Sequence, residues 1–194
     1  MKSTTYSLGA APIQRSRGYA SIEAFCAIFR QDMDSLYTLA LCLTASHDLA
    51  QQCFEAALND CRTGTAVFAE WARSWSRRAV IKSAIRLLDP VRFPMNGGLE
   101  TGVEAVALEL NSSARWLFRL DRIQRFVFVI SVLEGYAVRE CAALLGASPR
   151  EVEQARVRAL QAASNNQDIP PASHFINFEK AAQLNFRAPT WSRS

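Results

Sequence analysis

Three polar side chains at steps of four residues carry the clearest chemical potential in this sequence. Arg150, Gln154 and Arg158 fall on one side of a helix if the chain is helical there. Arginine can donate two hydrogen bonds to guanine and glutamine can pair with adenine, so this stripe could read bases in a DNA groove. Glu153 argues against that interpretation because its carboxylate repels phosphate, and a solvated helix face is the alternative.

Capping signals predict the helix that carries this stripe. Ser148 suits the N-cap, Pro149 the first helical position and Glu151 the third, which together form a capping box. Gly146 suits the left-handed position after an earlier helix. The inward faces of the two helices would consist of Val138, Cys141, Ala142 and Leu145, and of Val152, Ala155, Ala159 and Leu160. This pattern predicts a DNA-binding helix-turn-helix, with a generic helical hairpin as the alternative.

The residues predicted to contact DNA in this unit, through the major groove or phosphates, are Arg139, Arg150, Glu151, Gln154 and Arg158. One of them, Glu151, is also the third helical residue of the capping box.

A second candidate surface combines basic and aromatic residues. Residues 62 to 92 contain seven basic and two acidic side chains, whereas residues 18 to 61 contain one basic and six acidic side chains. Aromatic rings can stack on unpaired bases while basic groups bind phosphates. The candidates for a melted promoter strand are Trp71, Arg73, Trp75, Arg77, Arg78 and Lys82. For the two tryptophans, however, burial in the core is the favoured interpretation.

Apolar periodicity predicts an all-α protein built from two small helical domains. Helices are expected from about Ser21, Asp34 and Ser46, with a fourth that includes Val67 and Phe68 and continues to Ile81. The predicted boundaries are a helical domain at 19–88, a linker at 89–113, a helix-turn-helix domain at 114–164 and a tail at 165–194. A short helix is expected over 103–110, and the apolar run 126–130 is expected to be a buried helix.

Composition excludes several classes of protein. The 194-residue chain is 49% hydrophobic, and its longest apolar run is far below the roughly 18 residues that a membrane span needs. Without a hydrophobic N-terminal segment, a cytoplasmic protein that does not bind membranes is expected. No catalytic motif, phosphate loop or metal-ligand spacing is present, so we expect no enzyme, no cofactor, no metal and no small-molecule substrate. The five cysteines are expected to be reduced, and mostly buried.

With these motifs in view, the chain resembles an extracytoplasmic-function sigma factor over residues 20 to 164. The second unit is similar to region four through Leu133-Glu134-Gly135-Tyr136, Glu140, Ala142, Leu145-Gly146, Ser148, Val152 and Arg158-Ala159-Leu160. The first unit is similar to region two through Leu36 to Ala40, Leu43-Thr44, Asp48, Ala50, Phe54 and Trp71. The match is closer in the second unit than in the first.

The resemblance implies a function in transcription initiation, with core RNA polymerase and promoter DNA as partners and an anti-sigma factor as a further candidate. It places polymerase binding on the face that contains Gln51, Gln52 and Glu55. Here amides replace the family's acidic pair, and Arg78 and Lys82 stand where the family tends to have Asn and Asp. The alternatives are therefore a sigma-like regulator that does not open promoters and, more remotely, a helix-turn-helix repressor or activator.

Overall fold

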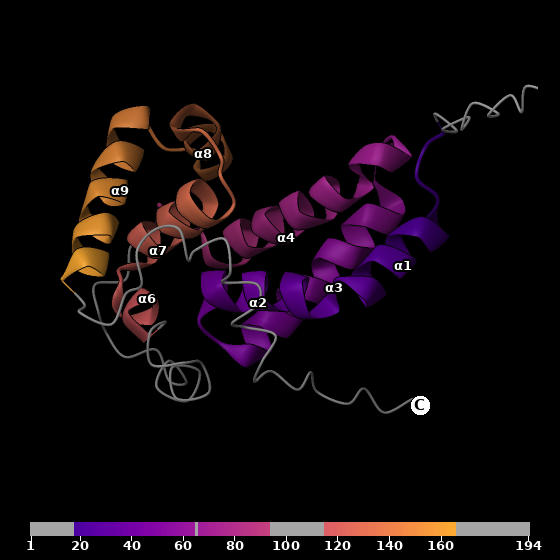
Figure 1. The fold of residues 1–194 in the computed structure, drawn as a ribbon, viewed down its shortest axis with the longest axis horizontal. Helices are drawn as coiled ribbons and strands as arrows, with labels where there is room; N and C mark the ends of the chain where they lie inside the picture. Colours follow the sequence, from indigo (N-terminus) through magenta and orange to yellow (C-terminus); the bar gives the residue numbers. More distant parts are fainter. Residues whose placement is uncertain (1–17, 65, 94–114, 166–194) are drawn as a thin grey trace, which may run out of the picture.

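The computed structural model of this chain describes residues 18–64, 66–93 and 115–165, and within them it is all-helical (Figure 1). The first part contains α1 (Ile22–Gln31), α2 (Met33–Thr44), α3 (His47–Thr63), the 3-10 turn η1 (Ala69–Trp71) and α4 (Ala72–Leu88). The second part contains α6 (Arg115–Arg119), α7 (Arg122–Phe128), the π-helical segment η3 (Val129–Leu133), α8 (Val138–Leu145) and α9 (Pro149–Ser164). These described residues form two helical clusters and no strand, apart from one isolated bridge between Tyr19 and Phe68.

Helices α1 to α4 form the first cluster, and their starts follow the predicted caps. The Ser21 hydroxyl accepts a hydrogen bond from the Ala24 amide at 3.2 Å, and the Ser46 hydroxyl accepts one from Leu49 at 3.5 Å. Each bond satisfies an amide that the first helical turn leaves without an intrahelical partner. Helix α2 is buried from Leu36 to Thr44 because α1, α3, α4 and the second cluster all pack around it.

The second cluster is built around α7 and η3, which α9 and α8 cover. Phe126, Val127, Phe128, Val129 and Ile130 are each at most 1% exposed, so the predicted buried helix is confirmed. The Trp116 ring of α6 meets the Phe128 ring edge-on, with centroids 4.9 Å apart. This core is what orients the α8–α9 pair.

Three expectations from the sequence are wrong. The fourth helix begins at Ala72, not before Val67, because the chain turns through an extended segment and η1 first. Trp71 is 58% exposed and is not a core residue, since it lies in η1 ahead of that helix. Leu160 is 39% exposed, because Ala159 occupies the inward position of α9.

The two clusters contact each other through α2, α4, α7 and the end of η3. Arg125 of α7 is only 3% exposed, and its Nε donates a hydrogen bond to the carbonyl oxygen of Leu43 at 3.2 Å. Among the described residues, no helix combines the length and apolarity that crossing a membrane requires. Most of the predicted linker, the expected helix at 103–110 and nearly all of the predicted tail lie outside the described residues.

Candidate nucleic-acid interface

The turn between α8 and α9 has the geometry that its residue types predict. Gly146 follows α8 with φ 67° and ψ 26°, a left-handed conformation that favours glycine. The Ala147 amide then donates to the carbonyl oxygen of Ala142 at 3.1 Å, which closes the end of α8. The backbone can therefore reverse within three residues, Gly146 to Ser148, and present the start of α9.

The predicted capping box at the start of α9 is confirmed. The Ser148 hydroxyl accepts from the Glu151 amide at 3.3 Å, and the Glu151 carboxylate accepts from the Ser148 amide at 2.8 Å. The Ser148 hydroxyl also donates to Glu151 Oε2 at 2.7 Å. These hydrogen bonds, first from the Ser148 hydroxyl and then from its backbone amide, lower the pKa of Glu151 from its ordinary value.

Helix α9 separates into a buried and an exposed face, and the stripe lies on the exposed one. Val152 and Ala159 are 0% exposed and Ala155 is 6% exposed, since this face packs on α7. Arg150, Gln154 and Arg158 are all exposed, as are Glu151 and Arg139 of α8. The structure thus places the five predicted DNA-contacting side chains on the surface of the α8–α9 pair.

Sequence reasoning missed two features of this surface. Val157 is 42% exposed on the side of α9 that carries the stripe, where an apolar group could contact a thymine methyl. Arg156 lies 3.8 Å from Glu153 through its Nη1, an i,i+3 pair that offsets part of the repelling charge of Glu153. The spacing of these residues on α9 was the available signal for both.

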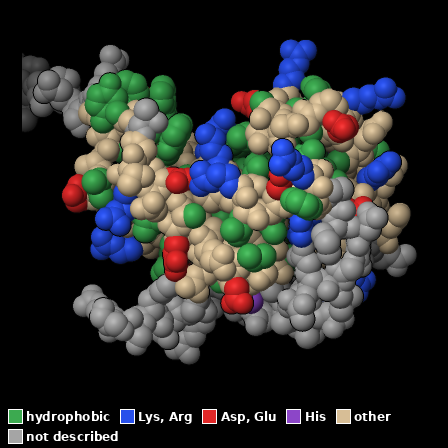
Figure 2. Space-filling view, turned by 180° about the vertical axis from the view of Figure 1, so that it is seen from behind, with side chains coloured by type: hydrophobic (Ala, Val, Ile, Leu, Met, Phe, Trp, Pro, Cys, Tyr) green, Lys and Arg blue, Asp and Glu red, His purple; other side chains and the backbone are tan. Residues whose placement is uncertain are grey.

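A separate exposed aromatic patch lies at the far end of the first cluster. It consists of Tyr19, Phe68 and Trp71, which are 63%, 38% and 58% exposed. The Tyr19 and Phe68 rings stack with centroids 5.0 Å apart, and the Trp71 ring meets Phe68 edge-on at 5.4 Å. Figure 2 shows exposed hydrophobic side chains at this end, and basic side chains spread over most of the same face.

Main-chain pairing is what brings Tyr19 into this patch. The Ala20 amide donates to Val67 at 2.6 Å and the Ala69 amide donates to Gly18 at 2.9 Å. No local pattern around Tyr19 indicates this pairing, because the partner segment lies far along the chain. An unpaired base can stack on exposed aromatic rings, so Trp71 remains a candidate for binding the melted strand.

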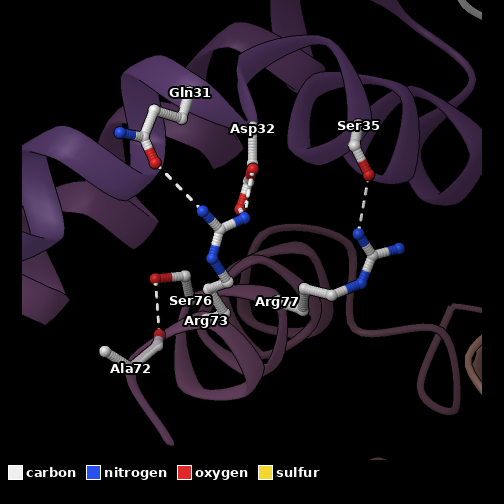
Figure 3. A network of polar contacts seen from close by, with 7 residues as sticks. All are labelled: Gln31, Asp32, Ser35, Ala72, Arg73, Ser76 and Arg77. Atoms are coloured by element: carbon white, nitrogen blue, oxygen red, sulfur yellow. Dashed lines mark hydrogen bonds and ion pairs between the residues drawn. The ribbon is translucent and has the colours of Figure 1, made fainter. Parts of the chain in front are cut away.

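Two of the predicted basic side chains of α4 have partners in different clusters. Arg73 donates to the Asp32 carboxylate at 2.6 Å and to the Gln31 side chain at 2.9 Å, both in the first cluster (Figure 3). Arg77, one turn further on, donates to the Ser35 hydroxyl at 2.7 Å and to the Glu134 carboxylate at 2.8 Å. Glu134 belongs to the second cluster.

The remaining strand-binding candidates have aromatic partners. The Arg78 guanidinium lies 5.8 Å from the ring centroid of Tyr136, which is also in the second cluster. The Lys82 ammonium lies 5.7 Å from the ring centroid of Trp75, which is partly buried against the core. The six candidates therefore do not form one continuous surface: Trp71 lies in the aromatic patch, whereas Arg77 and Arg78 face the second cluster.

The predicted polymerase-binding face is exposed on α3. Gln51, Gln52 and Glu55 all point outward, and the Gln51 amide donates to Glu55 Oε1 at 3.0 Å. This bond holds two of the three side chains together, so the face presents one carboxylate flanked by amides.

Four of the five cysteines, all within the described residues, are shielded from solvent. Cys42, Cys53, Cys61 and Cys141 are buried, Cys26 is half-buried, and all five are free thiols. Burial raises the pKa of Cys53 to about 12 and of Cys141 to about 11, which suppresses the nucleophilic thiolate. The residues that the structure describes also contain no cluster of His, Cys, Asp and Glu that could hold a metal ion.

No family model, no curated protein and no solved structure matches this chain. The features that bear on its function are the exposed face of α8 and α9, the aromatic patch and the contacts of α4.

Proposed function

We propose that this protein is a sigma factor that directs RNA polymerase to promoters. In this proposal α9 enters the major groove of one promoter element, while the first cluster binds core polymerase and the melted strand. The observation that carries the proposal is the α8–α9 unit, in which Val152 and Ala159 are buried while Arg150, Gln154 and Arg158 are exposed. Any amphipathic surface helix divides its residues in this way, so the proposal depends on the base-reading residue types Arg150 and Gln154 at the start of α9, directly after the turn at Gly146.

The position of each stripe residue along α9 suggests its role. The N-terminal residues of a recognition helix approach base edges, so Arg150 and Gln154 are assigned to base contacts. Arg158 lies eight residues after Arg150, which is about 12 Å along a helix, and is assigned to a phosphate. Arg139 of α8 is assigned to the sugar-phosphate backbone beside the groove.

The direct test starts from DNA rather than from a presumed promoter. Duplexes with a randomised segment are selected on the full chain, and the enriched sequences are placed upstream of a reporter. We expect core polymerase to transcribe these templates only with the protein present, and duplex binding to weaken steeply with salt. Salt-independent binding, or no enrichment of any sequence, would contradict the proposal.

A second candidate function has its own support. Arg77 and Arg78 face the second cluster, and amides replace the expected acidic pair at Gln51 and Gln52. Both features fit a sigma-like regulator that binds polymerase or an anti-sigma partner without opening promoters. Permanganate reactivity of promoter thymines separates the two functions: a sigma factor produces reactive unpaired thymines with core polymerase, whereas the regulator binds polymerase and produces none.

A further inference from the structure

One ion pair connects the two helical clusters through a residue that is also a candidate for binding the promoter strand. Arg77 of α4 donates through Nε and Nη2 to the two carboxylate oxygens of Glu134, the residue directly after η3, with Nε to Oε2 at 2.8 Å. Its Nη1 donates to the Ser35 hydroxyl of α2 at 2.7 Å. A bidentate ion pair of this kind has a defined geometry as well as charge, so it helps to fix the orientation of one cluster relative to the other.

The surroundings of this pair show that it belongs to a larger contact. The Glu134 side chain is 8% exposed and the Arg77 side chain is 29% exposed, so solvent screens the pair only in part. Arg78, the next residue, places its guanidinium on the Tyr136 ring. Arg122 of α7 donates to the carbonyl oxygens of Leu88 and Phe93, at 3.2 and 3.1 Å, at the far end of α4.

This contact occupies side-chain groups that a bound nucleic acid would need. Three donor bonds of Arg77 are directed at Glu134 and Ser35, and a phosphate would need those donors. The Glu134 carboxylate also repels an approaching phosphate. Arg73, on the preceding turn of the same helix, has its partners Asp32 and Gln31 within the first cluster and is the more exposed of the two arginines.

We propose that the Arg77–Glu134 pair is an autoinhibitory lock, which holds the second cluster against the strand-binding face of α4 until a partner or nucleic acid displaces it. The inference rests on the proposed function, because it takes α4 to be a nucleic-acid surface. Binding at Arg77 and pairing with Glu134 exclude each other, so each must weaken the other to the same extent. Opening also breaks the contact of α2 with α7 and η3 and the hydrogen bond from Arg125 to Leu43.

The test compares two neutralised carboxylates in the full-length protein. Glu134→Gln removes the partner of Arg77 across the two clusters, and Asp32→Asn removes the partner of Arg73 within one cluster. Each variant loses one negative charge and releases one arginine of α4, but only Glu134→Gln removes a contact between the clusters. The probe is fluorescein-labelled oligothymidylate, and dyes on Asn59 of α3 and Gln161 of α9, both exposed, report the separation of the clusters.

We expect Glu134→Gln to bind oligothymidylate at least about fivefold more tightly than the unsubstituted protein, with lower energy transfer between the dyes. Asp32→Asn should give a smaller gain in affinity and unchanged energy transfer. Equal gains for the two variants, unchanged transfer in Glu134→Gln, or no oligothymidylate binding by either variant would each overturn the lock.

A further variant keeps the test decisive if Glu134→Gln does not fold. Tyr136→Leu removes the ring beneath Arg78 and leaves the ion pair in place. It should lower energy transfer and tighten oligothymidylate binding by a smaller factor, and no change in either would contradict the lock. Duplex binding through α9, measured on the same samples, tests the proposed function separately. If the protein does not bind duplex DNA, the sigma-factor role is wrong. Oligothymidylate affinity and energy transfer still test whether the Arg77–Glu134 pair is a lock.

Discussion

At the scale of single residues, Arg150 and Arg158 have the same charge but different predicted roles. Arg150→Ala should weaken binding to the preferred duplex by about 1 to 3 kcal/mol and relax the preference at one base pair. Arg158→Ala should weaken binding to all duplexes alike and reduce the salt slope by about one ion. Fluorescence anisotropy across a salt series measures both effects.

The control for these variants is Arg30→Ala, which removes an exposed arginine from α1 in the other cluster. It should leave both the base preference and the salt slope close to those of the unsubstituted protein. If Arg150→Ala behaves like Arg30→Ala, the α9 stripe is not the base-reading surface.

The charge of Glu153 provides a second test at this scale. Glu153 is exposed on α9 and only loosely paired with Arg156. Glu153→Lys should tighten binding to duplexes of unrelated sequence, because a repelling charge becomes an attracting one. Binding that stays the same at low salt would show that DNA does not approach this side of α9.

At the scale of the element, the turn before α9 depends on the backbone freedom of Gly146. A Cβ at Gly146 would meet nothing within 4 Å, so a substitution there strains the backbone without a steric clash. Gly146→Ala should lower the free energy of unfolding by about 1 to 2 kcal/mol, since its φ of 67° is unfavourable for other residues. Gly18→Ala is the matched control, because a Cβ there also meets nothing within 4 Å and Gly18 is not at positive φ.

The stability that the capping box contributes at the start of α9 should depend on pH. Hydrogen bonds from Ser148 lower the pKa of Glu151 in the folded state below its ordinary value of 4.5. The stability that the carboxylate contributes is therefore complete above about pH 4.5 and is lost as the pH falls through the lower, folded-state pKa.

Glu151→Gln tests this response. Unfolding free energies of the variant and the unsubstituted protein, measured across that range, should converge as the pH falls. A difference that stays constant with pH would contradict the role of the ionised carboxylate. Ser148→Ala should cost about 1 kcal/mol at neutral pH, because it removes the hydroxyl of the cap.

At the scale of the whole molecule, the burial of the cysteines predicts how the native protein reacts with a thiol reagent. Cys26 is half-buried, whereas the other four are buried, and burial raises the pKa of each of these four. One thiol should react quickly in the native state and four only after denaturant is added. Fast reaction of two or more thiols with Ellman's reagent would show that the native packing opens readily.

Local sequence signals predicted much of the fold and of the α9 site. Ser21, Ser46 and the Ser148–Glu151 box each mark a helix start, and the run from Phe126 to Ile130 forms a buried helix. These predictions hold because caps and apolar periodicity act within a few residues. The same local rules placed Val67 and Phe68 in a helix, where a long-range main-chain bridge with the segment around Tyr19 forms instead.

Short-range hydrogen bonds and helical spacing determine most of the helices, the turn at Gly146 and the exposed stripe of Arg150, Gln154 and Arg158, so these features could be predicted from local sequence. The surroundings of the basic residues on α4 depend instead on tertiary packing. Arg73 and Arg77 are one turn apart and equivalent in sequence, yet one pairs with Asp32 and the other with Glu134 of the second cluster. Which carboxylate a guanidinium meets depends on how the two clusters pack, and that packing joins residues too distant in the chain for any local pattern to connect.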